Sequence, residues 1–114
     1  MRNMIWLVAL VVSFAFAGKA LADGKATYEK ICGVCHDPHG KGIPGLAPKH
    51  VGNKFLIESK PEDIKKLVRT GRAGAAKKYK EFPLDMPAQP ASVISDAQLD
   101  EVVAYEQGDL QKQK

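Results

Sequence analysis

The chain has 114 residues, with 17 lysines and arginines against 13 aspartates and glutamates, a formal net charge of +4 and 45% hydrophobic residues. It is long enough for one small domain and too short for two. Such a mild positive charge, without interleaved basic and aromatic side chains, argues against nucleic-acid binding. These features exclude a multidomain protein and set nucleic acid aside as a partner.

The first 22 residues have the pattern of a secretory signal peptide. A basic start at Arg2 precedes an apolar run over residues 4–17, and the segment "ALA" at 20–22 is a small-x-small cleavage pattern. The run of roughly 14 residues is shorter than the roughly 20 that span a bilayer. We therefore expect a signal peptide at 1–22, export to the periplasm and no stable membrane span after cleavage. A retained anchor and a cut after Ala17 are the alternatives.

The domain that would remain, residues 23–114, is poor in large apolar side chains. Its net charge falls to +2, because the two charges lost with the signal, Arg2 and Lys19, are both positive. The only tryptophan, Trp6, lies in the signal as well. The core is thin for this length, and a large apolar cofactor would fill it.

The mature chain shows helical periodicity, without an alternating strand pattern or an internal repeat. The pattern predicts an all-α fold. The first helix is predicted over about residues 24–31, running into Cys32, with Ala26, Tyr28 and Ile31 facing inward.

The pentapeptide "CGVCH", Cys32 to His36, contains both cysteines of the chain and a histidine directly after the second. Thioether bonds from two cysteines at this spacing attach a haem through its vinyl groups, and the turn places His36 under the iron. The motif therefore predicts one covalent haem c, with His36 as the proximal iron ligand.

A redox dithiol and half of a zinc site are the other chemistries that use a Cys-x-x-Cys pair. A thioredoxin-like dithiol would require a βαβ context, which is not visible. A zinc site would require two further ligands, and the remaining histidines are only His39 and His50. Neither alternative has a specific use for His36.

A loop rich in glycine and proline is predicted over residues 36–53, followed by a helix over residues 59–71. In that helix Ser59 and Glu62 form a capping-box pattern, Pro61 suits the first turn, and Gly71 is the terminator. Its apolar face comprises Ile64, Leu67 and Val68.

Met86 is the only methionine after the signal, and it lies in the proline-rich segment "EFPLDMPAQP". Prolines on both sides deny this segment a helix and stiffen it. A methionine that fills a core lies on a helix or strand face, whereas Met86 lies at the tip of a rigid loop. We predict that its sulfur is the distal iron ligand. His50 is the main rival, while His39 lies too close in sequence to His36 and is predicted to be solvated.

The last predicted helix begins with a capping box of Ser95 and Gln98 and ends at Gly108. Its buried stripe comprises Leu99, Val102, Val103 and Tyr105. The tail "DLQKQK" is predicted to fray.

From first helix to closing helix, the mature chain resembles the small soluble bacterial class I c-type cytochromes, which carry one haem. The resemblance rests on "CGVCH", on the "DMP" around Met86 and on the order of the elements. In that family the first helix packs crosswise on the last through a glycine and an aromatic residue, which here are Gly24 and Tyr28. Their partners on the last helix are Val102 and Tyr105.

The family resemblance also implies roles for residues outside the motif. A proline carbonyl after the haem motif accepts a hydrogen bond from the ligand histidine, and Pro48 is the candidate, with Pro44 second. No tryptophan is present to hold a haem propionate, so Tyr79 and Arg72 are the candidates for that contact.

The sequence thus predicts a periplasmic electron carrier that shuttles single electrons and has no catalytic residues of its own. Redox partner proteins are expected to dock near the haem edge, where Lys41, Lys49 and Lys54 would steer them. Two alternatives stay open: a haem subunit of a larger oxidoreductase complex, and a sensor of small ligands with an open distal site.

Overall fold

The computed structural model describes residues 24–73 and 78–113, so the predicted signal peptide lies outside the described residues. Within these ranges the chain forms helices joined by loops, with two isolated β-bridges and no strand. The predicted all-α fold is confirmed.

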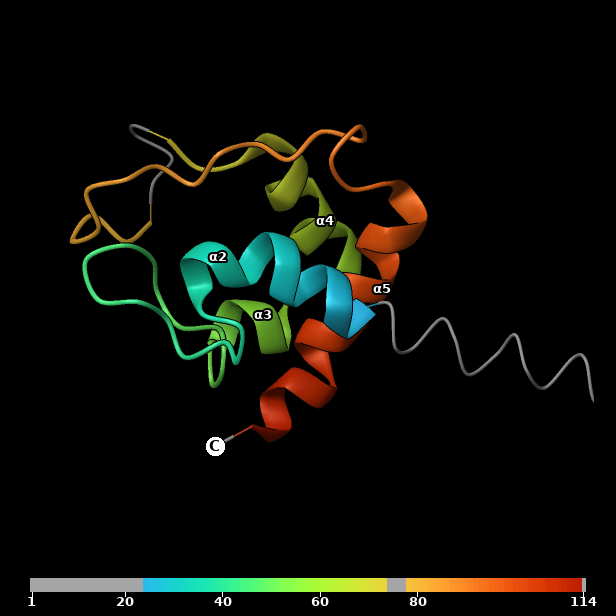
Figure 1. The fold of residues 1–114 in the computed structure, drawn as a ribbon, viewed down its shortest axis with the longest axis horizontal. Coiled ribbons are helices and arrows are strands. Elements are labelled where there is room, and N and C mark those ends of the chain that lie inside the picture. Colours follow the sequence, from blue (N-terminus) through green and yellow to red (C-terminus); the bar gives the residue numbers. More distant parts are fainter. Residues whose placement is uncertain (1–23, 74–77, 114) are drawn as a thin grey trace, which may run out of the picture.

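The first helix is continuous from residue 24 to residue 36 (Figure 1). It begins as α-helix, widens into the π-helical turn η1, Tyr28–Cys32, and finishes as α2, Gly33–His36. The helix therefore carries the whole of "CGVCH". Ala26, which was predicted to face inward, is exposed, because it lies two residues from the buried Tyr28 and so on the opposite side of the helix.

The first helix crosses α5, Asp96–Gln107, at close range. A Cβ atom at Gly24 would lie 2.6 Å from the carbonyl oxygen of Glu101, so only glycine permits this approach. One turn further, the rings of Tyr28 and Tyr105 pack with centroids 5.4 Å apart. The predicted crossing of the first and last helices is thus present.

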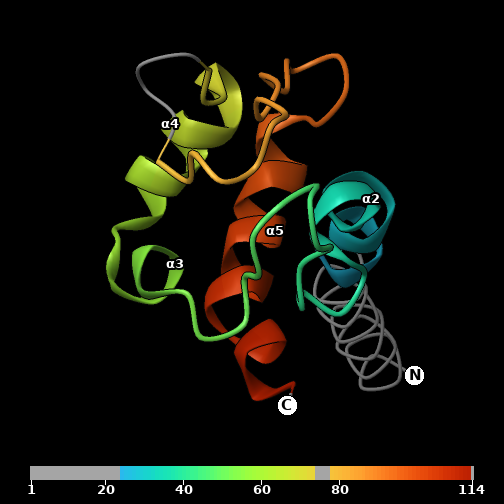
Figure 2. The ribbon, with the colours of Figure 1, turned by 90° about the vertical axis from the view of Figure 1, so that its left-hand side faces the viewer.

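Helix α5 lies between the first helix on one side and α3, Lys54–Glu58, and α4, Pro61–Thr70, on the other (Figure 2). Helix α3 was not predicted from the sequence, although Asn53 caps it by accepting a hydrogen bond from the Leu56 amide. The predicted capping box of α4 is wrong. Ser59 ends α3 by donating its amide to Phe55, so α4 begins one residue later, with Lys60 as its N-cap and Pro61 at its first position.

The last helix agrees with its predicted boundaries and caps. Ser95 and Gln98 form the capping box, and Gly108 caps the C-terminus. The prediction that the tail frays is wrong for residues 109–112. A 3₁₀ turn, Asp109–Lys112, buries Leu110 completely.

The hydrophobic core lies where these helices meet. Its buried members from α4 and α5 include the predicted Ile64, Val68, Leu99, Val102, Val103 and Tyr105. Cys32 and Met86, which are far apart in the sequence, pack against the same core from the side of a large cavity.

Candidate haem site

A cavity of about 390 Å³ opens between the first helix, α4 and the loop that carries Met86. Its lining is mainly apolar. The lining includes Cys32, Cys35 and His36 from the first helix, His50 from the loop that follows it, and Met86 from its own loop. Two cysteines, the adjacent histidine and a second axial donor, for which Met86 and His50 are the candidates, make up the donor set that a covalently attached haem requires.

The two cysteines are free thiols in this structure, and both are partly exposed. Burial, with smaller contributions from Glu106 and Cys35, raises the pKa of the Cys32 thiol to about 12. A nucleophilic dithiol needs the opposite shift, because the thiolate is the reactive form. No group of three histidine, cysteine, aspartate or glutamate side chains that could hold a metal occurs within residues 24–73 and 78–113. Both observations count against the dithiol and zinc alternatives.

His36 is oriented by the loop that follows it. Its Nδ1 lies 2.8 Å from the carbonyl oxygen of Pro48. A carbonyl only accepts, so Nδ1 carries the proton and Nε2 keeps its lone pair. Burial lowers the pKa of His36, which favours the neutral imidazole that binds metals. Pro44, the second candidate for this contact, is exposed and does not line the cavity.

His50 stacks on the ring of His36 with centroids 3.8 Å apart. Its Nδ1 lies 2.8 Å from the hydroxyl of Tyr28, and burial, together with the neighbouring His36, lowers its pKa to about 3. A ring stacked against His36 lies on the same side of the cavity as His36. This position does not suit a ligand for the opposite face of a haem bound through His36.

The Met86 loop is joined to the end of α4 by an antiparallel bridge. The amide of Arg72 donates to the carbonyl of Met86, and the amide of Met86 donates back to Arg72, both at 2.9 Å. Gly71, with φ of +69°, lies so close that a Cβ there would be 2.5 Å from the Met86 carbonyl oxygen. The glycine predicted as a helix terminator therefore also makes room for the loop.

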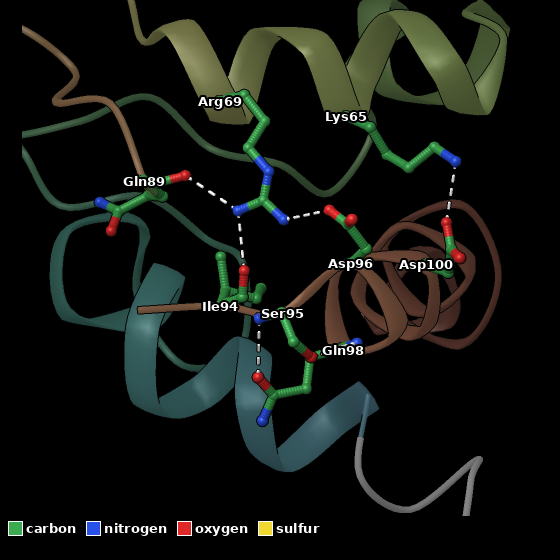
Figure 3. Close-up of polar contacts among 8 residues, drawn as sticks. All are labelled: Lys65, Arg69, Gln89, Ile94, Ser95, Asp96, Gln98 and Asp100. Atoms are coloured by element: carbon green, nitrogen blue, oxygen red, sulfur yellow. Dashed lines mark hydrogen bonds and ion pairs between the residues drawn. The ribbon is translucent and has the colours of Figure 1, made fainter. Parts of the chain in front are cut away.

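Arg69 holds the chain after Met86, and the sequence analysis missed it (Figure 3). Its guanidinium donates to the carbonyls of Gln89 at 3.0 Å and Ile94 at 2.7 Å, and it pairs with Asp96 at 2.6 Å. One side chain on α4 thus fixes both the Met86 loop and the start of α5. A helical arginine gave no sequence signal for this role.

Arg72 and Tyr79, the predicted propionate contacts, both line the cavity. The Arg72 guanidinium lies over the Phe55 ring, and the Tyr79 hydroxyl accepts a hydrogen bond from Asn53. His39 is exposed, as predicted.

Glu106 is a second residue that sequence reasoning missed. It follows Tyr105 on α5, is 2% exposed and lines the cavity. Its signal was present in the sequence, because position 106 follows Val103 by three residues and Val102 by four, on the buried stripe itself, where a glutamate is unusual.

Comparison with known proteins decides the family. The family model described as cytochrome c oxidase, cbb3-type, subunit III matches residues 19–105. The chain belongs to this family of c-type cytochromes. It is a small all-α c-type cytochrome that carries covalently bound haem c and functions in haem-based electron transfer.

A curated relative of this cytochrome is the cytochrome c subunit of 4-cresol dehydrogenase [hydroxylating] from Pseudomonas putida. The two are 36% identical over 94 residues, which cover 78% of this chain and 66% of the relative. The match thus spans a little less than two thirds of the relative's length. No solved structure matches the chain significantly. No helix among residues 24–73 and 78–113 is long and apolar enough to cross a bilayer.

Proposed function

We propose that this cytochrome is a periplasmic carrier of single electrons, exported by a signal peptide at residues 1–22. In this proposal haem c is joined to Cys32 and Cys35, with its iron between His36 and Met86. The observation that carries the proposal is the cavity itself, which gathers these four side chains from segments some fifty residues apart onto one apolar space. When bound there, the haem supplies a one-electron Fe(III)/Fe(II) couple.

The chain's own residues keep both proposed ligands in place. The Pro48 carbonyl fixes the tautomer and orientation of His36, which also makes Nε2 a better donor. The bridge to Arg72 fixes the backbone of Met86. Ligands that are held this way do not move when the charge changes, so little reorganisation accompanies electron transfer. The soft sulfur of Met86 favours the reduced state and raises the potential.

One edge of the site is open to solvent. Val34, between the two cysteines, is 67% exposed, and Leu84 in the Met86 loop is 59% exposed. We propose that a partner's cofactor approaches at this edge, guided by the exposed Lys41, Lys49 and Lys54. Arg72 and Tyr79 are our candidates for holding the propionates.

A second candidate function is that of a subunit in a larger oxidoreductase. Two descriptions favour this function, because the matching family and the curated relative are both described as subunits of oxidoreductases. In that case the open edge would face a permanent partner. The third candidate, a ligand sensor, requires that Met86 does not bind the iron, so that the distal position is open to a small ligand.

Absorption spectra of both redox states test the proposal. We expect the bands of a six-coordinate haem c, the weak far-red charge-transfer band of a methionine–iron bond in the ferric form, and no rapid carbon monoxide binding on reduction. Rapid carbon monoxide binding without the far-red band would favour the sensor. A native pull-down from the source cells then separates the remaining two candidates, because only a subunit would retain a stoichiometric partner.

A further inference from the structure

Glu106 is a buried carboxyl that takes no part in the proposed attachment and ligation of the haem. It is 2% exposed, and its Oε2 atom is buried without a hydrogen-bond partner. No ion pair of Glu106 occurs in the described part of the chain. Burying an unpaired carboxylate costs several kcal/mol, so its charge is sustained only if something else in the cavity compensates it.

The groups that face Glu106 do not neutralise it. From the first helix, Tyr28 and Cys32 face it; burial raises the pKa of both, and the charge of Glu106 raises it further. From α3 and α4, the residues that line the shared cavity are apolar: Phe55, Leu56, Ile64, Leu67 and Val68. From the turn after α5, Gln111 donates to the Glu106 backbone carbonyl. The other ionisable or charged lining residues are Cys35, His36, His50, Arg72, Lys78, Tyr79 and Asp85.

Neither cation of the cavity lining, Arg72 or Lys78, forms an ion pair with Glu106 among the described residues, which leaves Glu106 sensitive to a change of charge in the cavity. Burial raises its pKa to about 8. Reduction of the iron removes one positive charge from the same cavity, and a less positive surrounding favours the protonated carboxyl. Proton binding at Glu106 and electron binding at the iron therefore strengthen each other, and this coupling is reciprocal.

We propose that Glu106 couples electron transfer to proton transfer in this cytochrome. When the donor supplies one electron, the Glu106 carboxylate takes one proton from solvent to form an O–H bond. When the electron passes to the acceptor, that O–H bond breaks and the proton returns to solvent. The inference rests on the proposed function, because it requires a reversible one-electron couple in the cavity.

The test is the midpoint potential of the holoprotein as a function of pH. We expect the midpoint potential of the wild type to fall as pH rises. One proton per electron limits the fall to a tenfold change in the redox equilibrium constant per pH unit, which is about 59 mV. Glu106→Gln keeps the shape of the side chain but cannot titrate, so the midpoint potential of this variant should not change with pH. Glu101→Gln, on the same helix but outside the cavity lining, should retain the wild-type slope.

A slope that persists in Glu106→Gln, or a flat wild-type profile, would overturn the inference. His50→Asn identifies the other candidate group, and loss of the slope in that variant alone would assign the proton to His50 instead. If Glu106→Gln does not mature, the infrared difference between reduced and oxidised wild type decides. A protonated-carboxyl band that appears on reduction supports Glu106, and its absence overturns the inference. Failure of the proposed function differs from all of these, because no reversible couple or no methionine band would then be found.

Discussion

At the scale of single residues, Met86 separates an electron carrier from a ligand sensor. We expect Met86→Ala to abolish the far-red band and to lower the midpoint potential by on the order of 0.1 V, within the span of about 0.8 V that axial ligands cover. Met86→His should also lower the potential while the iron stays six-coordinate, which tests the softness of sulfur separately from an open site. Spectra and redox titration measure both effects.

Val93→Ala is the matched control for Met86, because Val93 is half-exposed and lies outside the cavity lining. It should leave the band and the potential unchanged. An unchanged band and potential in Met86→Ala would make Met86 a packing residue.

Glu106 also gives the fold a pH dependence of its own. Its pKa is raised by burial from 4.5 to about 8, so its contribution to stability is fully present below about pH 4.5 and is lost as pH rises through about 8. Glu106→Gln has no proton to lose. At about pH 9 we expect it to be more stable than wild type by a few kcal/mol, and at about pH 5 by much less. Urea denaturation at the two pH values measures the difference, and an equal gain at both would contradict the prediction.

At the scale of elements, the link between α4 and the Met86 loop decides how firmly the proposed distal ligand is held. Arg69→Met removes the donor for the Gln89 and Ile94 carbonyls, so we expect a loss of about 1–3 kcal/mol in the free energy of unfolding. The far-red band should also disappear at a lower temperature than in wild type.

Lys65→Met is the control for Arg69 on the same helix. Lys65 pairs with Asp100 across the same two helices, but its contact does not reach the Met86 loop (Figure 3). The band should melt in this variant as in wild type. Equal effects of the two substitutions would show that Arg69 stabilises the helix pair alone.

Gly71 offers a sharper test of the same link. Gly71→Ala places a Cβ against the Met86 carbonyl and also forces alanine into a positive φ. Gly45→Ala also places alanine at a positive φ, +76°, but with nothing within 4 Å of the new Cβ. We expect both to lose about 1–3 kcal/mol from backbone strain, and only Gly71→Ala to weaken the far-red band. A far-red band of equal strength in the two variants would argue that the bridge between Arg72 and Met86 does not position Met86.

At the scale of the whole molecule, the cofactor completes the core. The buried apolar residues surround a cavity of about 390 Å³, so the protein without haem lacks packing at its centre. Cys32→Ala or Cys35→Ala should give haem that acid–acetone partly extracts, or protein that fails to mature, and the removal of both cysteines should leave largely unfolded chain. Circular dichroism and haem extraction measure these outcomes. A chain that lacks both cysteines and the haem but still folds compactly would contradict this account of the core.

The features that the sequence alone determined are those that depend on neighbours within one or two turns. The spacing of "CGVCH", the Ser95 and Gln98 cap and the apolar stripe of α5 are local patterns, because helix geometry places residues three and four apart on one face. The Gly24 and Tyr28 crossing was predicted only through the resemblance to a family. The cap at Ser59 failed because a competing local structure, the end of α3, used the same residue.

Tertiary structure alone decided the contacts between segments that are distant in the sequence. It stacked His50 on His36, joined Met86 to Arg72, set Arg69 to hold the Met86 loop, and buried Glu106 in the cavity. None of these follows from spacing, because each depends on which faces of the helices meet and how closely. The sequence therefore named the candidate haem-binding residues, whereas packing decided which of them line one cavity and which charged side chains line it with them.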